Sequence, residues 1–114
     1  MSFRQPRLSH LLTLETSIAH PDGAGGYSNS WTVLGHLWAA VEVASGRATA
    51  GETSPITRVG YNIILRASPE GSASRPRAGQ RFRQGKRLYQ IKTVKPADPS
   101  ARYLSCFATE ELAL

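Results

Sequence analysis

The residues of this chain that could bind a metal are three histidines and one cysteine. The histidines, His10, His20 and His36, are ten and sixteen residues apart, and none has a second ligand at the short spacing that zinc sites use. Cys106 stands alone in the segment YLSCFA, which excludes an internal disulfide and suits a small apolar residue in a strand. Because the sequence has neither an HExxH nor a CxxC motif, we predict no metal site and no cofactor.

The carboxylates offer no recognisable acid–base pair. Glu15, Asp22, Glu42 and Glu52 are isolated in the sequence, and no pattern marks two of them for general acid and base catalysis. Glu42, flanked by two valines, is interpreted as an outward-facing charge or as the salt-bridge partner of an arginine. An enzyme would also need a pocket with converging polar groups, which the sequence does not indicate. We therefore predict that the chain is not an enzyme.

The length of 114 residues predicts a single domain, residues 1–114, with a polar arm over residues 1–7 and a short tail over residues 110–114. Ten glycines and seven prolines indicate many turns and few long helices, which favours a mainly β fold. No apolar run reaches the ~18 residues of a membrane span, and the N-terminus lacks the apolar segment of a secretory signal. We therefore expect no membrane partner and a cytoplasmic site of synthesis.

Positive charge is concentrated in the C-terminal half. Between Gly60 and Tyr103 there are ten basic residues and two acidic ones, whereas the whole chain has a net charge of +6. Such a bias indicates a nearby polyanion, most commonly nucleic acid, or an acidic protein surface. The alternative is an ordinary solvated basic face.

The densest apolar run is WTVLGHLWAAVEV, residues 31–43, and it contains both tryptophans. Its β-branched and aromatic content and its alternation predict a bent central strand, with a break at Gly35 and with Trp38 on the face opposite Leu37. A first strand is predicted from the alternating residues 9–18. The segment 19–29, AHPDGAGGYSN, is rich in turn residues and predicts a long mobile loop.

Four further strands follow the central one. Residues 57–67 alternate clearly, residues 81–94 form a hairpin around Gly85, and residues 102–109 form the last strand. Residues 44–55 predict a flexible connection with at most a short helix over 47–50, and residues 68–79 predict a second polar loop. Five or six strands with one short helix and long flexible loops indicate a small antiparallel β-barrel or sandwich.

Several segments, taken in order, resemble the phage head–tail joining proteins, also called head–tail adaptors or head-closure stoppers. They are the strand RLSHLLTLE, the loop DGAGGYSNSW, the strand LWAAVEV, a Gly46-Arg47 step, the strand from Arg58 to Arg66, the hairpin GKRLYQI and the strand that begins at Tyr103. The family often has a glutamate straight after the Gly-Arg step, whereas this chain has Ala48 there and its next glutamate is Glu52. The residues that carry the fold motif are Trp31, Trp38, Ala39, Gly85, Tyr89 and Ile91.

The resemblance implies a β-barrel subunit in the neck of a tailed phage or of a gene transfer agent, assembled in a bacterial cytoplasm. It implies a homo-oligomeric ring, a hexamer or dodecamer, between a portal or adaptor ring and a tail terminator, with double-stranded DNA passing through the bore. Such a ring would join the DNA-filled head to the tail and close or extend the DNA channel. Loop 44–55 is our candidate for the gating element, and the candidates for the channel or DNA-facing surface are Arg47, Glu52, Arg58, Arg75 and Arg77.

The alternative function is a monomeric nucleic-acid-binding β-barrel module. In that interpretation, aromatic side chains beside the arginines would stack on bases. The residues available for stacking are Tyr61, Phe82, Tyr89, Tyr103 and Phe107.

Overall fold

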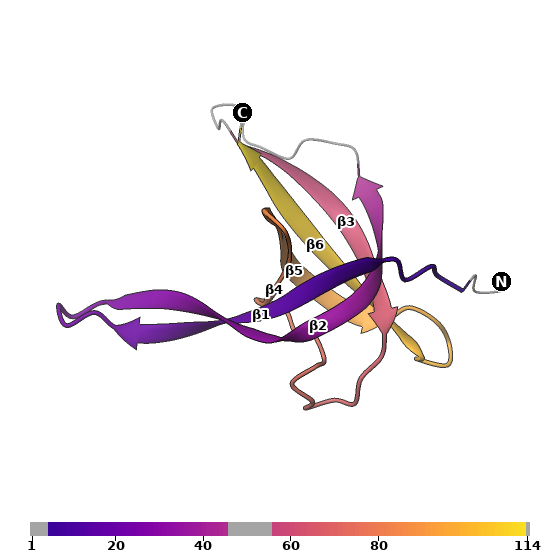
Figure 1. Ribbon diagram of the computed structural model, residues 1–114, viewed down its shortest axis with the longest axis horizontal. Coiled ribbons are helices and arrows are strands. Elements are labelled where there is room, and N and C mark those ends of the chain that lie inside the picture. The colour runs from indigo at the N-terminus through magenta and orange to yellow at the C-terminus, as the bar shows by residue number, and fades with distance from the viewer. Residues whose placement is uncertain (1–4, 46–55, 114) are drawn as a thin grey trace.

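The computed structural model describes residues 5–45 and 56–113, and every helix or strand element in these ranges is a β-strand (Figure 1). The predicted mainly β class is therefore confirmed. The predicted short helix over 47–50 lies outside the described residues. The described part contains no helix of the length and hydropathy needed to span a membrane. Its strands are β1 (His10–Pro21), β2 (Tyr27–Ser45), β3 (Ile56–Arg66), β4 (Arg81–Gln84), β5 (Arg87–Pro96) and β6 (Tyr103–Ala113).

The strands close into a barrel in the order β1-β2-β3-β6-β5-β4. All neighbouring strands are antiparallel, and the ring closes where the short β4 pairs with β1, from Thr13 opposite Arg83 to Glu15 opposite Arg81. The sequence pattern allows either a barrel or a sandwich. The pairing of β4 with β1 decides in favour of the barrel, because it leaves no open edge in that part of the sheet.

Where the strands form the barrel wall, alternate side chains point into the barrel interior. Tyr61, Ile63 and Leu65 of β3 point inward, as their alternation predicts, and Tyr89 and Ile91 of β5 do the same. All six strands contribute to this core, whose buried members are Leu12, Leu14, Ala39, Tyr61, Ile63, Leu65, Phe82, Tyr89, Ile91, Leu104, Cys106 and Ala108.

The predicted bent central strand lies within β2, a single strand of 19 residues whose irregularity is next to the predicted break at Gly35. Leu14 pairs with Gly35 while Glu15 pairs with Val33, so Leu34 is an extra residue on β2 and forms a β-bulge. A bulge bends its strand and increases the local twist. It lies where β1 and β2 turn away from the barrel wall (Figure 1).

The predicted loop over residues 19–29 is wrong. The two strands stay paired as far as Pro21 opposite Tyr27, and the turn occupies only residues 22–26. The segment contains the Pro, Asp and Gly residues of a turn, but the strand residues on both sides of that turn do not pack against the barrel core. Strand residues without a buried face lose the apolar alternation by which strands are predicted.

The last strand is also longer than predicted. β6 continues to Ala113, with Glu110 opposite Val59, so most of the predicted tail over 110–114 is paired strand. The predicted hairpin around Gly85 is formed by β4 and β5, and its turn is Gly85-Lys86, where Gly85 adopts a φ of 61°. Residues 67–80 form the long connection between β3 and β4.

Candidate assembly surface

The most prominent surface of the molecule is a two-stranded hairpin that projects from the barrel (Figure 1). Beyond Glu15 and Val33, the pairs from Thr16–Thr32 to Pro21–Tyr27 form no backbone pairing with a third strand among the described residues. Six residues at ~3.3 Å each make an arm roughly 20 Å long. The radius of gyration of 15.5 Å exceeds the ~13 Å of a compact domain of this length because the arm projects.

The tip of the hairpin is held by Asp22. Its Oδ1 accepts hydrogen bonds from the backbone N–H groups of Ala24 at 2.8 Å and Gly26 at 3.0 Å. These bonds lower the pKa of Asp22, so its carboxylate is ionised at neutral pH. Next to it, the side chain of Tyr27 is 73% exposed. The arm therefore ends in an ordered turn that presents one negative charge and one aromatic ring.

The root of the hairpin is fixed by an ionic cluster on the outer wall of the barrel. Arg81 Nε donates to Glu15 Oε1 at 2.7 Å, and Arg83 Nε donates to Glu15 Oε2 at 2.9 Å. The guanidinium carbon of Arg81 lies 3.9 Å from the ring centroid of Trp31, a close cation–π contact. Burial tends to raise the pKa of Glu15, but the hydrogen bonds from both arginines outweigh it and lower that pKa. The cluster thus ties β2 to β1 and β4 where the arm leaves the barrel.

A second exposed apolar area lies on the outer wall of the barrel. Leu11 and Trp38 are opposite one another in the β1–β2 register, and their exposed fractions are 48% and 56%. Trp38 points away from the core, on the face predicted for it. Large apolar side chains exposed together are typical of a surface that contacts another protein.

A hollow of about 500 Å³ lies between the root of the hairpin and the 67–80 connection. Thr16 and Leu34 line it from the hairpin side. The connection is held in place by the buried Pro76 and by Arg75, whose Nη1 donates to the carbonyl oxygen of Ser68 at 2.8 Å. The remaining lining comes from the connection itself: Glu70, Gly71, Ser72, Ala73, Arg75, Arg77 and Gln80.

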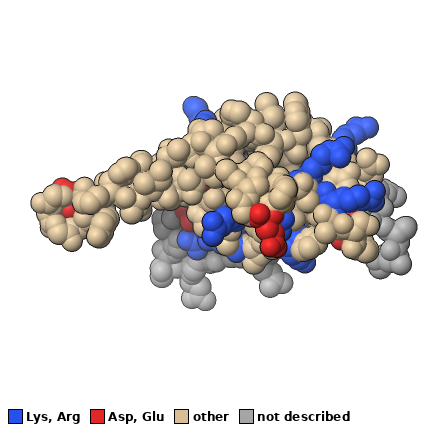
Figure 2. All heavy atoms as spheres, turned by 90° about the horizontal axis from the view of Figure 1, so that it is seen from below, with Lys and Arg blue, Asp and Glu red and all other residues tan. Residues whose placement is uncertain are grey.

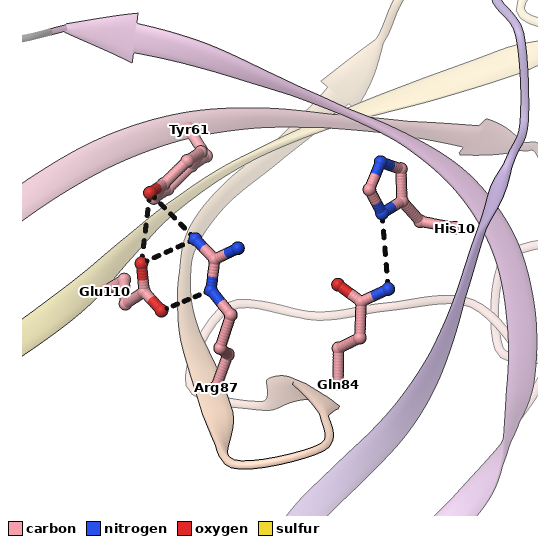
Figure 3. A network of polar contacts seen from close by, with 5 residues as sticks. All are labelled: His10, Tyr61, Gln84, Arg87 and Glu110. Atoms are coloured by element: carbon pink, nitrogen blue, oxygen red, sulfur yellow. Dashed lines mark hydrogen bonds and ion pairs between the residues drawn. The ribbon is translucent and has the colours of Figure 1, made fainter.

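A partly buried polar network lies in a different part of the barrel (Figure 3). Arg87 donates to both oxygens of Glu110 at 2.8 and 2.9 Å, and the hydroxyl of Tyr61 donates to Glu110 at 3.0 Å. The hydrogen bonds from Arg87 lower the pKa of Glu110 despite its burial. Burial, followed by the neighbouring carboxylate, raises the pKa of Tyr61. Figure 3 also shows the bond of 3.2 Å between Gln84 and His10.

Much of the basic excess of the C-terminal half is paired within the chain. Arg81, Arg83 and Arg87 bind the carboxylates described above, and Arg102 contacts Asp98 at 3.4 Å. Figure 2 shows the blue basic side chains on the barrel and none on the projecting hairpin. Within the described ranges, the cations without an ion-pair partner include Arg77, Lys86, Lys92 and Lys95.

The residues predicted to face the channel are not gathered in one place. Arg47 and Glu52 lie outside the described residues. Arg58 is half exposed and binds Glu111 at 3.0 Å, whereas Arg75 and Arg77 line the hollow.

Of the fold-motif residues, Ala39, Tyr89 and Ile91 are in the core, and Gly85 forms the β4–β5 turn. Trp31 and Trp38, by contrast, lie outside the core.

Sequence reasoning did not find the role of Glu15 or that of Glu110. Glu15 lies 66 and 68 residues from its two arginines, so no local pattern connects them. The available signal was the alternation of Arg81 and Arg83 around the apolar Phe82, which places both guanidinium groups on one face.

In the part of the chain that the structure describes, no three His, Cys, Asp or Glu residues are grouped to hold a metal ion.

Comparisons with known proteins agree with this fold. A family model described as phage head completion protein matches residues 3–111. A chain in the virion of a native gene transfer agent particle is 44% identical with a TM-score of 0.86, over 96% of this chain and 100% of that one. The solution structure of protein SF1141 from Shigella flexneri 2a is 20% identical with a TM-score of 0.64, over 95% and 96% of the two chains, and shows the fold alone. Among curated proteins the comparison found no match. The predicted resemblance to head–tail joining proteins is thus confirmed, and the chain belongs to the phage head completion protein family, whose role is structural.

Proposed function

We propose that the chain is a subunit of the neck of a tailed, phage-like particle, where it forms a homo-oligomeric ring between head and tail. The family model and the relative from a gene transfer agent virion support a location in the particle and contacts with other head and tail proteins. That relative is aligned over its whole length, so the proposal rests on no added domain. Its neighbours in the particle would be a portal or adaptor ring on one side and a tail terminator on the other.

The observation that carries the ring is the projecting hairpin, because a two-stranded arm without other support is only marginally stable in water. The arm exposes Tyr27, while the barrel wall exposes Leu11 and Trp38 elsewhere on the same molecule. Two different contact surfaces on one subunit produce head-to-tail association, which closes into a ring when the rotation between copies allows it. Six or twelve copies would form the closed ring.

Double-stranded DNA would pass through the bore of this ring. The unpaired Lys86, Lys92 and Lys95 of the described ranges are available for phosphate contacts, and such contacts are independent of sequence and sensitive to salt. Arg47, Glu52, Arg58 and Arg75 remain proposed channel residues. Through this bore the ring would extend the DNA channel or close it after packaging.

The alternative, a monomeric nucleic-acid-binding module, is less well supported. Four of the five aromatic residues that it would need for base stacking are buried: Tyr61, Phe82, Tyr89 and Tyr103. A buried ring cannot receive a base without opening the barrel.

Electron microscopy of the neck in purified particles tests this function. We expect density for the chain as a ring between head and tail, and we expect particles made without the chain to contain heads that are not joined to tails. The control is the same strain complemented with the unaltered chain, which should restore joined particles. Joined particles without the chain in the neck, or the chain found only as a monomer on nucleic acid, would contradict the proposal.

A further inference from the structure

The hollow beside the 67–80 connection cannot be filled by the tip of its own hairpin. Thr16 and Leu34 at the root of the hairpin form one wall of the hollow. The tip lies at the far end of the same arm, roughly 20 Å away at ~3.3 Å for each residue. A hairpin tip that enters the hollow must therefore come from another copy of the chain.

The hollow has enough volume to receive an aromatic side chain from the tip. The tip is narrow, with two strands joined by the five residues 22–26, and it presents Tyr27 at 73% exposure. A volume of about 500 Å³ is within the range of ~300–1,000 Å³ that binding pockets have. Aromatic side chains that insert into pockets are common anchors of protein interfaces.

The charges of the tip and the hollow are complementary. Residues 16–33 contain no lysine or arginine, and Asp22 is their one ionised carboxylate. The charged side chains that line the hollow are Glu70, Arg75 and Arg77. Arg75 is held by the carbonyl oxygen of Ser68, whereas the guanidinium of Arg77 has no hydrogen-bond or ion-pair partner among the described residues. Arg77 is therefore available to a carboxylate from outside.

We propose that the hairpin tip of one copy docks in the hollow of the next, with the Tyr27 ring against the connection and Asp22 paired with Arg77. The proposal rests on the ring of the proposed function and names the surface that joins its subunits. Each copy gives a tip to one neighbour and receives a tip from the other, so the contact is head-to-tail. The two arginines at the hollow offset the repulsion that Glu70 exerts on Asp22.

Cysteine cross-linking in assembled particles tests the contact. The double variant Ala24→Cys/Ala73→Cys places one thiol on the tip and one at the hollow while it keeps the Tyr27 ring, and the native Cys106 is fully buried and does not compete. After treatment with a short bismaleimide, we expect a ladder of dimers, trimers and larger species. Particles that carry a mixture of the two single variants should give dimers only. The control pair Ala24→Cys/Ser100→Cys, which has an exposed thiol outside the hollow, should give no ladder.

Three outcomes would overturn the proposal. One is the absence of a ladder in particles whose neck contains the ring. Another is dimers from Ala24→Cys alone, which would indicate a tip-to-tip contact. The third is a cross-link from Ala24→Cys to a different neck protein, which would make that protein the partner of the tip. Absence of the chain from the neck would instead refute the proposed function. The contact itself would then be tested on concentrated purified chain, which must give the same ladder if the tip docks in the hollow.

Charge-neutral variants provide a second measurement that does not depend on thiol geometry. Asp22→Asn removes the charge but keeps the Oδ1 acceptor that holds the turn, and Arg77→Gln removes the charge on the hollow. We expect each to lower the yield of joined particles roughly threefold or more. The double variant should be no worse than either single one, because both remove the same contact. Effects that multiply would show that the two residues do not meet.

Discussion

Arg81 joins two parts of the molecule, because its guanidinium stacks 3.9 Å from the Trp31 ring centroid while its Nε donates to Glu15 at 2.7 Å. Trp31 belongs to the projecting part of β2, and Glu15 belongs to the part of β1 that still pairs with the barrel. The direction of the hairpin is therefore set by a contact at its root.

The first prediction concerns the charge of Glu15. Glu15→Gln should lower the free energy of unfolding by about 2 kcal/mol, because two arginines lose a buried charged acceptor. Urea denaturation measures the loss. The matched control is Glu111→Gln, which removes the half-exposed pair with Arg58 and should cost less than about 1 kcal/mol. Equal costs at the two positions would contradict a stabilising role for the cluster.

The second prediction concerns acid. The pKa values of Glu15 and Glu110 are below their ordinary value of 4.5 in the folded chain, so the unfolded chain takes up protons first as the pH falls. The stabilisation is fully present above the unfolded-state pKa and is lost as the pH falls through the folded-state values. The urea midpoint should therefore decline below about pH 5. In Glu15→Gln/Glu110→Gln this decline should be shallower, and a parallel decline would refute the assignment to these two residues.

The third prediction compares two tyrosines in the barrel. Their rings are 5.2 Å apart at 87°, but the hydroxyl of Tyr61 contacts Glu110 and Arg87, whereas that of Tyr89 is buried with no hydrogen-bond partner among the described residues. Tyr61→Phe should cost about 1 kcal/mol of unfolding free energy, and Tyr89→Phe should be neutral or stabilising. Thermal and urea unfolding of both variants provide the measurement. A larger cost at Tyr89 would indicate a partner for its hydroxyl.

The fourth prediction separates folding from assembly at two adjacent leucines. Leu12 is fully buried and Leu11 is 48% exposed on the outer wall beside Trp38. Leu12→Ala should lower the free energy of unfolding by about 2–5 kcal/mol. Leu11→Ala should change it by less than about 1 kcal/mol and should reduce incorporation into particles, measured by immunoblot of purified particles. Normal incorporation of Leu11→Ala would exclude this wall from the contacts of the neck.

The strands with one buried face were predictable from the sequence because burial on one side imposes a period of two. This holds for β3 and for the hairpin around Gly85. The projecting part of β1 and β2 was not predictable, since both of its faces meet solvent and nothing requires alternation there. Ile18, for example, ends the alternating segment from which the first strand was predicted, but it lies on the arm at 42% exposure.

The candidate site was less predictable than the fold, for a related reason. The charge count correctly indicated an excess of arginine, but it could not say which arginines are neutralised by carboxylates far away in the sequence. Arg87 and Glu110 are 23 residues apart and meet only because β5 and β6 are neighbours in the barrel. Whether the guanidinium of Arg77 is free to bind an outside carboxylate depends on such tertiary contacts. The sequence alone does not show that Glu70, which also lines the hollow, forms no ion pair with it.

The projecting hairpin also leaves the outer backbone edges of residues 17–21 and 27–31 without strand partners among the described residues. Open edges can add a strand from any passing chain, which is a route to aggregation. Here Pro21 lacks an N–H to offer and the glycines of the turn interrupt the edge, so the exposed stretch is short. These features limit that route while the arm of a newly made subunit is uncovered, and a ring built from separate copies requires such protection.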